Sequence, residues 1–186
     1  MSVRPALLAI LSIAPCYGNQ LRVEFERRSG GGRGLNVGQV YSTLDRLERD
    51  GCVTKASPDA AGLVVYHITA SGRAEARRWL ESPVASADAR DELAPKVALA
   101  LTIPALDVAA IVSAQRDATL AELTRLRAEK SLTLERRVVI EALILAAEAE
   151  LSWLDRLPDI VAAARPYGVD TDAPRRGRPS RHTTTR

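Results

Sequence analysis

The chain has 186 residues, of which 46% are hydrophobic and 26% charged, so it is long enough for one or two small domains with apolar cores. No apolar run reaches the roughly 18 residues of a membrane-spanning helix, and two isolated cysteines without a CxxC spacing predict a reduced, cytoplasmic protein rather than a disulfide framework. The net charge of +3 is unevenly distributed along the chain. Residues 1–82 and 166–186 are basic overall, whereas residues 83–165 are acidic, so a basic N-terminal module could face phosphates.

The first apolar stretch, residues 3–13, is predicted to form a buried helix that Pro15 ends. A signal-peptide core is the alternative, but the flank has one basic residue and no Ala-x-Ala cleavage site follows. Tyr17-Gly18-Asn19 predicts a turn, with Asn19 as the cap of a second helix over residues 19–28.

A third helix is predicted between Asn36, whose side chain can cap its first turn, and Gly51, which can end it in the left-handed conformation. Its apolar positions share one face: Val37, Val40, Leu44 and Leu47. The opposite face presents Gly38, Gln39, Ser42, Arg46 and Arg49. Such small and hydrogen-bonding groups suit a helix that enters the major groove, although an ordinary surface helix is compatible with this stretch alone.

The neighbouring segments decide between these interpretations. The glycine-rich residues 29–34 lack the Gly-Lys-Ser/Thr ending of a phosphate-binding loop and are predicted to connect the two helices of a helix-turn-helix. Residues 52–56 and 63–68 are predicted strands around a turn, and a helix follows from Thr69. Three helices followed by a hairpin predict a winged helix.

Specific residues carry a family resemblance. The motif Val40-Tyr41-Ser42-Thr43-Leu44-x-Arg46-Leu47-Glu48-x-x-Gly51-x-Val53, followed by Tyr66-x-Ile68-Thr69-x-x-Gly72 and preceded by Tyr17-Gly18-x-x-Leu21, resembles the PadR family of transcriptional regulators. The resemblance covers about residues 3–82 and implies a homodimeric winged-helix DNA-binding protein, usually a repressor, sometimes released by a small aromatic ligand. Members often carry basic residues before the strand tyrosine, whereas here Leu63-Val64-Val65 precede Tyr66 and only Lys55 is basic near the hairpin.

The remainder is predicted to be helical. A helix is expected over residues 91–101, with Pro95 in its first turn, and others over residues 107–130 and 132–157. The last has a wide apolar face: Leu132, Val139, Ile140, Leu143, Ile144, Ala147, Leu151 and Leu154. The simplest cover for so wide a face is a second copy of the chain.

The predicted fold is mainly α with a small β wing. Its predicted parts are a winged helix-turn-helix domain (residues 1–82), an α-helical dimerisation domain (83–165) and a basic disordered tail (166–186). The candidate DNA-contacting residues are Asn19, Gln20, Asn36, Gly38, Gln39, Tyr41, Ser42, Thr43, Arg46 and Lys55. The candidate dimerisation residues are Val139, Leu143, Ile144, Leu151 and Leu154.

The sequence suggests two further sites. Trp79 and Trp153 are candidates for a small aromatic effector, with helix packing as the alternative role. Arg176 and Arg178 flank a glycine in the tail and resemble a minor-groove reader, with plain solubilising charge as the alternative. No cofactor is expected, since two scattered histidines make no metal site and no activated nucleophile is present. The sequence therefore predicts a DNA-binding regulator and not an enzyme; the alternative is a winged helix that binds protein.

Overall fold

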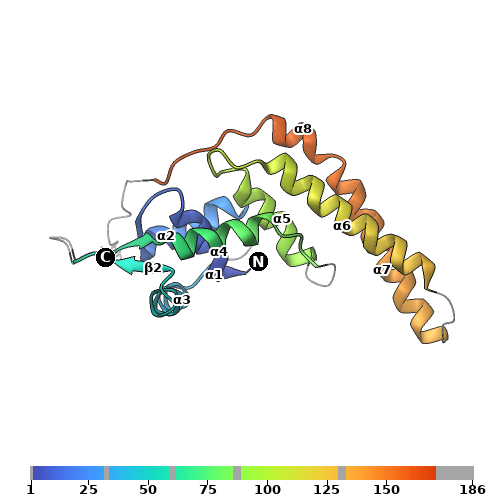
Figure 1. Cartoon of the computed structure of the whole chain (residues 1–186), viewed down its shortest axis with the longest axis horizontal. Helices are drawn as coiled ribbons and strands as arrows, with labels where there is room; N and C mark the ends of the chain where they lie inside the picture. Colours follow the sequence, from blue (N-terminus) through green and yellow to red (C-terminus); the bar gives the residue numbers. More distant parts are fainter. Residues whose placement is uncertain (1, 32–33, 59–61, 86–88, 130–132, 171–186) are drawn as a thin grey trace, which may run out of the picture.

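The computed structural model describes residues 2–31, 34–58, 62–85, 89–129 and 133–170. Its elements, in chain order, are α1 (Val3–Leu11), β1 (Cys16–Tyr17), α2 (Gly18–Arg28), α3 (Val37–Arg49), β2 (Val53–Lys55), β3 (Val65–Ile68), α4 (Ala70–Glu81), α5 (Ala89–Ala100), α6 (Val108–Ala128), α7 (Leu134–Leu154) and α8 (Leu157–Ala162). The predicted fold class is confirmed: the chain is mainly helical, with one small sheet and a winged helix-turn-helix at its N-terminal end (Figure 1).

Helix α1 lies at the centre of the N-terminal half, since every side chain from Ala6 to Leu11 is buried. It contacts α2, α3, α4 and β3. The helix ends at Leu11, two residues earlier than predicted: Ser12 is its C-cap, and the amide of Ile13 bonds to the carbonyl of Ile10 at 3.0 Å in a tighter turn.

The turn predicted at Tyr17-Gly18-Asn19 is wrong in part. Cys16 and Tyr17 form β1, which pairs antiparallel with β3 and gives the sheet the order β1-β3-β2. Helix α2 starts directly at Gly18 with Tyr17 as its N-cap, and Asn19 does not cap it. The Asn19 side chain instead accepts a 3.3 Å hydrogen bond from Arg22 inside the helix.

The predicted ends of α3 are confirmed. The Asn36 side chain accepts a 2.7 Å hydrogen bond from the amide of Gln39. At the other end Gly51 has φ of 70°, and the amides of Gly51 and Cys52 bond back to the carbonyls of Glu48 and Leu47. This left-handed glycine turn sends the chain directly into β2.

The wing is shorter than predicted, with three and four residues in its strands, and Val53 pairs with Ile68. Thr69 then caps α4, accepting from the amide of Gly72, and donates a second hydrogen bond of 2.8 Å to the carbonyl of Gly51. The end of α3 and the start of α4 are thereby joined.

In the C-terminal half, α5 begins earlier than predicted, so Pro95 lies inside the helix and not in its first turn. Helices α6 and α7, each of 21 residues, lie side by side and extend away from the rest of the molecule (Figure 1). We call them the arm. The single helix predicted over residues 132–157 is wrong at its end, because α7 stops at Leu154 and α8 begins at Leu157.

After α8 the chain runs without helix or strand from residue 163 to 170, back toward α2 (Figure 1). We call this segment the strap. Residues 166–170 were predicted to belong to a disordered tail, but Tyr167, Gly168 and Asp170 contact α2.

One continuous core joins the two halves, since buried side chains of α5, of the start of α6 and of α8 pack with those of α1–α4. Within the described residues, no helix is both long and apolar enough to cross a bilayer.

Candidate nucleic-acid interface

One face of α3 is buried and the other is open to solvent. Val40, Leu44 and Leu47 are fully buried, which fixes the rotation of the helix about its axis. The exposed face carries Gly38, Gln39, Tyr41, Ser42, Asp45, Arg46 and Arg49. Val37, predicted on the apolar face, is 48% exposed because it lies in the first turn, where the helix has left the core.

The two arginines of this face have no acidic partner among the described residues. In that part of the chain Arg46 bonds to its own helix, with Nε 3.3 Å from the carbonyl of Ser42 and Nη2 3.4 Å from the hydroxyl of Thr43. Among the described residues, no carboxylate forms an ion pair with Arg46 or Arg49. Their remaining guanidinium donors can therefore bind phosphates or guanine edges.

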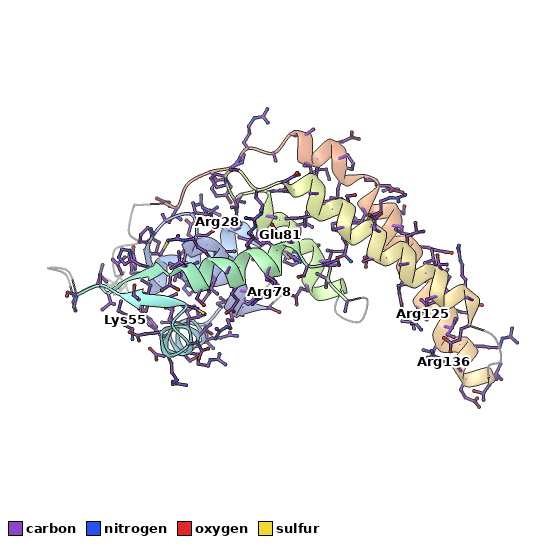
Figure 2. The ribbon with its side chains drawn as sticks, in the orientation of Figure 1. Arg28, Lys55, Arg78, Glu81, Arg125 and Arg136 are labelled. Carbon is purple, nitrogen blue, oxygen red and sulfur yellow. The ribbon has the colours of Figure 1, made fainter. Side chains whose placement is uncertain are left out.

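The wing lysine, Lys55, differs from the two arginines because it has carboxylate partners. Lys55 lies against α3 at the edge of the sheet (Figure 2), with Nζ 2.5 Å from Glu48 and 3.3 Å from Asp45. The Glu48 carboxylate, followed by that of Asp45, raises the pKa of Lys55 above its ordinary value. Lys55 was predicted to contact DNA, but its charge is already matched by two carboxylates of α3.

Two other candidates are turned away from solvent. Thr43 is 2% exposed, and its hydroxyl donates to the carbonyl of Gln39 at 2.7 Å. Gln20 is 7% exposed and donates to the carbonyl of Asp170 in the strap. Neither side chain belongs to the exposed surface: Thr43 bonds to Gln39 and Arg46 from the buried side of α3, and Gln20 lies under the strap.

Tyr41 connects the exposed face of α3 to the beginning of α2. A side-chain carbon on Gly18 would lie 2.7 Å from the Tyr41 ring, so the ring rests against the glycine backbone. Tyr41 is 42% exposed, and the hydroxyl end of its ring also lies close to Gly18. Asn19, half-buried in the first turn of α2, is beside this contact.

An ion-pair network anchors the far end of α3. Arg4 of α1 lies 2.5 Å from Asp50 and 2.7 Å from Glu75 of α4. Chiefly through the hydrogen bond from Arg4, the pKa of Glu75 is lowered. The Cys52 thiol also donates to Glu75, at 3.4 Å, so α1, α4 and the residue before β2 meet at this carboxylate.

The predicted dimerisation residues divide into three groups. Leu154 is 1% exposed and belongs to the core of its own chain. Ile144 and Leu151 are half-buried, whereas Val139 and Leu143 are 49% and 36% exposed. Exposed apolar residues of α7 that were not predicted are Leu134, Val138 and Leu145.

The two tryptophans have packing roles. The Trp79 indole donates to Glu92 at 3.0 Å, and the ammonium of Lys96 lies 5.5 Å from its ring centre. Trp153 packs against the core. A cavity of about 860 Å³ lies elsewhere, between α4, the start of α6 and residues 103–107. Its lining includes Arg73, Arg77, Leu80, Ile103, Leu106 and Ala110.

A buried ion pair in α2 is the main feature that sequence reasoning missed. Glu24 and Arg28 have fully buried side chains, with Arg28 Nε 2.6 Å from Glu24. Their spacing of four residues was the only signal, and it equally fits an exposed helix pair. Arg176 and Arg178 lie outside the described residues. Within those residues no cluster of three potential metal ligands occurs.

Comparisons with known proteins agree with this geometry. Residues 7–78 match the family described as "Transcriptional regulator PadR-like family", and residues 89–160 match "Virulence activator alpha C-term". No curated protein sequence has significant similarity to the chain.

Several solved structures are similar at low identity. Bacillus subtilis PadR in complex with operator DNA is 19% identical, with 85% of this chain and 98% of that chain covered and a TM-score of 0.41. The same protein in complex with p-coumaric acid is 19% identical over 86% and 98%, with a TM-score of 0.39. The Vibrio cholerae virulence activator AphA is 22% identical over 88% and 100%, with a TM-score of 0.40.

Proposed function

Because residues 7–78 place this chain in the PadR-like family of transcriptional regulators, we propose that it is a homodimeric repressor that reads duplex DNA with the exposed face of α3. The observation that carries the proposal is the pair of arginines on that face, beside Gln39 and Ser42, that have no acidic partner among the described residues. Arginine bonds bidentately to guanine, glutamine can do so to adenine, and either group can bind phosphate.

We expect Arg46→Ala and Gln39→Ala each to weaken specific DNA binding without loss of fold, because both side chains are exposed. If Arg46 reads a guanine, the loss is about 1–3 kcal/mol and falls on one base position. The measurement is titration of the DNA upstream of the protein's own gene against unrelated competitor DNA. Arg125→Ala, which removes an exposed arginine far out on the arm (Figure 2), is the matched control and should bind normally.

Full affinity in both α3 variants would contradict this assignment. The competing function is a winged helix that binds protein. Sequence preference measured at moderate salt separates the two, since plain phosphate contacts release counterions and weaken steeply as salt rises whatever the sequence, whereas specific binding persists. Binding that is weak, indifferent to sequence and absent at moderate salt would favour the protein-binding alternative.

The dimer rests on the outer side of α7. At about 100° per residue, the exposed apolar side chains span roughly half of the helix circumference, next to the side that packs on α6. Leu134, Val138 and Leu145 are 72%, 64% and 63% exposed. An apolar strip of this extent is typical of an interface, and a second copy of the arm offers a matching surface.

We expect the native protein to sediment at twice the 20.1 kDa of its chain, and Val138→Glu or Leu145→Glu to sediment as a monomer. Both positions are exposed in the single chain, so the substitution leaves its core intact and places a charge in the interface. Ile160→Glu, at a position of α8 that is 55% exposed, is the control and should remain dimeric. A native monomer at micromolar concentration would disprove the dimer.

A small aromatic effector, the ligand type that the family resemblance implies, would suit the cavity beside α4 better than either tryptophan. The lining of the cavity includes Leu80 and Ile103, and Arg73 supplies a cation for an acidic group, whereas the nearby Arg77 is paired with Glu81 at 2.7 Å. Stabilisation of the protein against heat by p-coumaric acid, lost when Ala110→Trp fills the cavity, would support this ligand class.

The arginine-rich end of the chain is the remaining candidate contact. The strap brings Asp170, the residue that precedes this segment, to α2 of the helix-turn-helix. We expect a chain that ends at Asp170 to bind its operator more weakly. A loss confined to A·T-rich flanks indicates insertion of Arg176 and Arg178 into the minor groove, whereas an equal loss that fades with salt indicates plain charge. No change at all would show that this segment does not touch DNA.

A further inference from the structure

The strap lies outside both matched segments of the chain and joins the base of the arm to the helix-turn-helix. It follows α8, which packs on α6 and α7, and it ends on α2. Helix α2 in turn contacts α3. The strap therefore connects the arm to α3 by way of α2. This connection is separate from the chain segment between α4 and α5.

The strap is held by the buried ion pair of α2. Glu24 accepts from Arg28 at 2.6 Å, from Arg27 at 2.7 Å and from the amide of Asp170 at 3.1 Å. Burial by itself raises the pKa of Glu24, but the hydrogen bonds from Arg27, Asp170 and Arg28 outweigh it and hold the pKa below its ordinary value. The carboxylate is thus ionised, buried and satisfied in part by the strap.

Arg28 joins three segments at once. Besides Glu24, its guanidinium donates to the Thr102 hydroxyl after α5 at 2.8 Å and to the Gly168 carbonyl at 2.7 Å. The ring of Tyr167 covers the guanidiniums of Arg27 and Arg28, each 4.4 Å from the ring centre. The amide of Tyr167 also donates to the carbonyl of Thr102, at 3.4 Å.

A buried ion pair contributes little net stability, but it tolerates few arrangements, because a displaced partner leaves an uncompensated charge. We propose that the strap and the Glu24–Arg28 pair form a joint that fixes the position of α3 relative to the arm, and so sets the half-site spacing that the dimer accepts. This inference rests on the proposed dimeric DNA-binding function. Tyr167 acts as a positioning residue, since it holds the strap on both arginines without lying on the DNA-reading face.

The first test measures the joint without DNA. Spin labels on Ser42→Cys in α3 and Thr124→Cys in α6 report the distance between α3 and the arm within one protomer, after dilution with unlabelled protein. The native thiols are buried, and burial raises the pKa of Cys16 to about 12, so the label reacts with the introduced cysteines.

Three proteins should give one narrow distance distribution: the native chain, Tyr167→Phe, which keeps the ring, and a chain that ends at Asp170. Tyr167→Ala, Asp170→Pro, which removes the amide donor to Glu24, and a chain that ends at Ala164 should give broader distributions. Unchanged distributions in all three of these variants would overturn the proposal.

The second test uses DNA duplexes whose half-sites are moved apart or together by one or two base pairs. The unlabelled native protein and Tyr167→Phe should bind the altered duplexes on the order of tenfold more weakly than the native spacing. Tyr167→Ala should discriminate less between spacings. Its affinity for the duplex of native spacing should fall, and its affinity for the altered duplexes should fall less. An unchanged spacing preference despite broadened distances would overturn the role in spacing. Absence of specific binding by the native protein would instead contradict the proposed function, while the distance measurement still decides the joint.

Discussion

Arg28→Met is expected to lower the free energy of unfolding by about 3–5 kcal/mol, because it leaves the carboxylate of Glu24 buried without the guanidinium of Arg28 as its counter-ion. The same substitution also removes the hydrogen bonds to Thr102 and Gly168. Equilibrium unfolding in urea measures the loss. Arg27→Met is the matched control, since Arg27 bonds to the same carboxylate but its side chain is 42% exposed, and its loss should be near 1 kcal/mol or less.

The loss should depend on pH in a definite direction. The folded-state pKa of Glu24 is lowered, so its contribution is fully present above the ordinary value of about 4.3 and disappears as the pH falls through the folded pKa. The difference in stability between the native protein and Arg28→Met should therefore shrink in acid. A difference that is constant from neutral pH into acid would show that Glu24 is not responsible.

Gly72→Ala is expected to destabilise the protein by at least about 1–3 kcal/mol through overpacking. A side-chain carbon at Gly72 would lie 2.2 Å from the carbonyl oxygen of Cys52 and 2.8 Å from a carbon of Ile68. The first obstacle is backbone, so α4 would have to move away from the start of the wing. Thermal unfolding measures the effect.

The control is the same substitution in α3. A side-chain carbon at Gly38 meets only the Asn36 side chain, at 3.3 Å, so Gly38→Ala should be neutral or stabilising by less than about 1 kcal/mol. Equal effects of the two substitutions would mean that the contact between Gly72 and Cys52 does not constrain α4.

The sequence predicted well those features that depend on neighbouring residues. Asn36 and Gly51 delimit α3 because capping and left-handed turns are local chemistry. The burial of Val40, Leu44 and Leu47 follows from their spacing. That spacing also places Thr43 on the same buried side, which argues against Thr43 as a DNA-contacting residue.

Features that depend on distant partners were missed. A strand of two residues has no periodicity, and β1 exists only because Cys16 and Tyr17 pair with β3. Leu154 is buried because it packs in the core that joins the two halves of the molecule, and Gln20 because it bonds to the strap. These partners lie far away in sequence or in segments without a pattern, so only the three-dimensional structure shows them.

The length of the arm demands precision at its base. A helix of 21 residues is about 32 Å long, so a rotation of about 6° where α6 leaves the core displaces the far end by about 3 Å. The rise of duplex DNA is 3.4 Å per base pair. In a dimer that meets through two such arms, a variation of a few degrees in the angle between arm and core changes the distance between the two α3 helices by about one base pair. The angular stiffness at the base of the arm would therefore limit how closely the dimer can discriminate between half-site spacings.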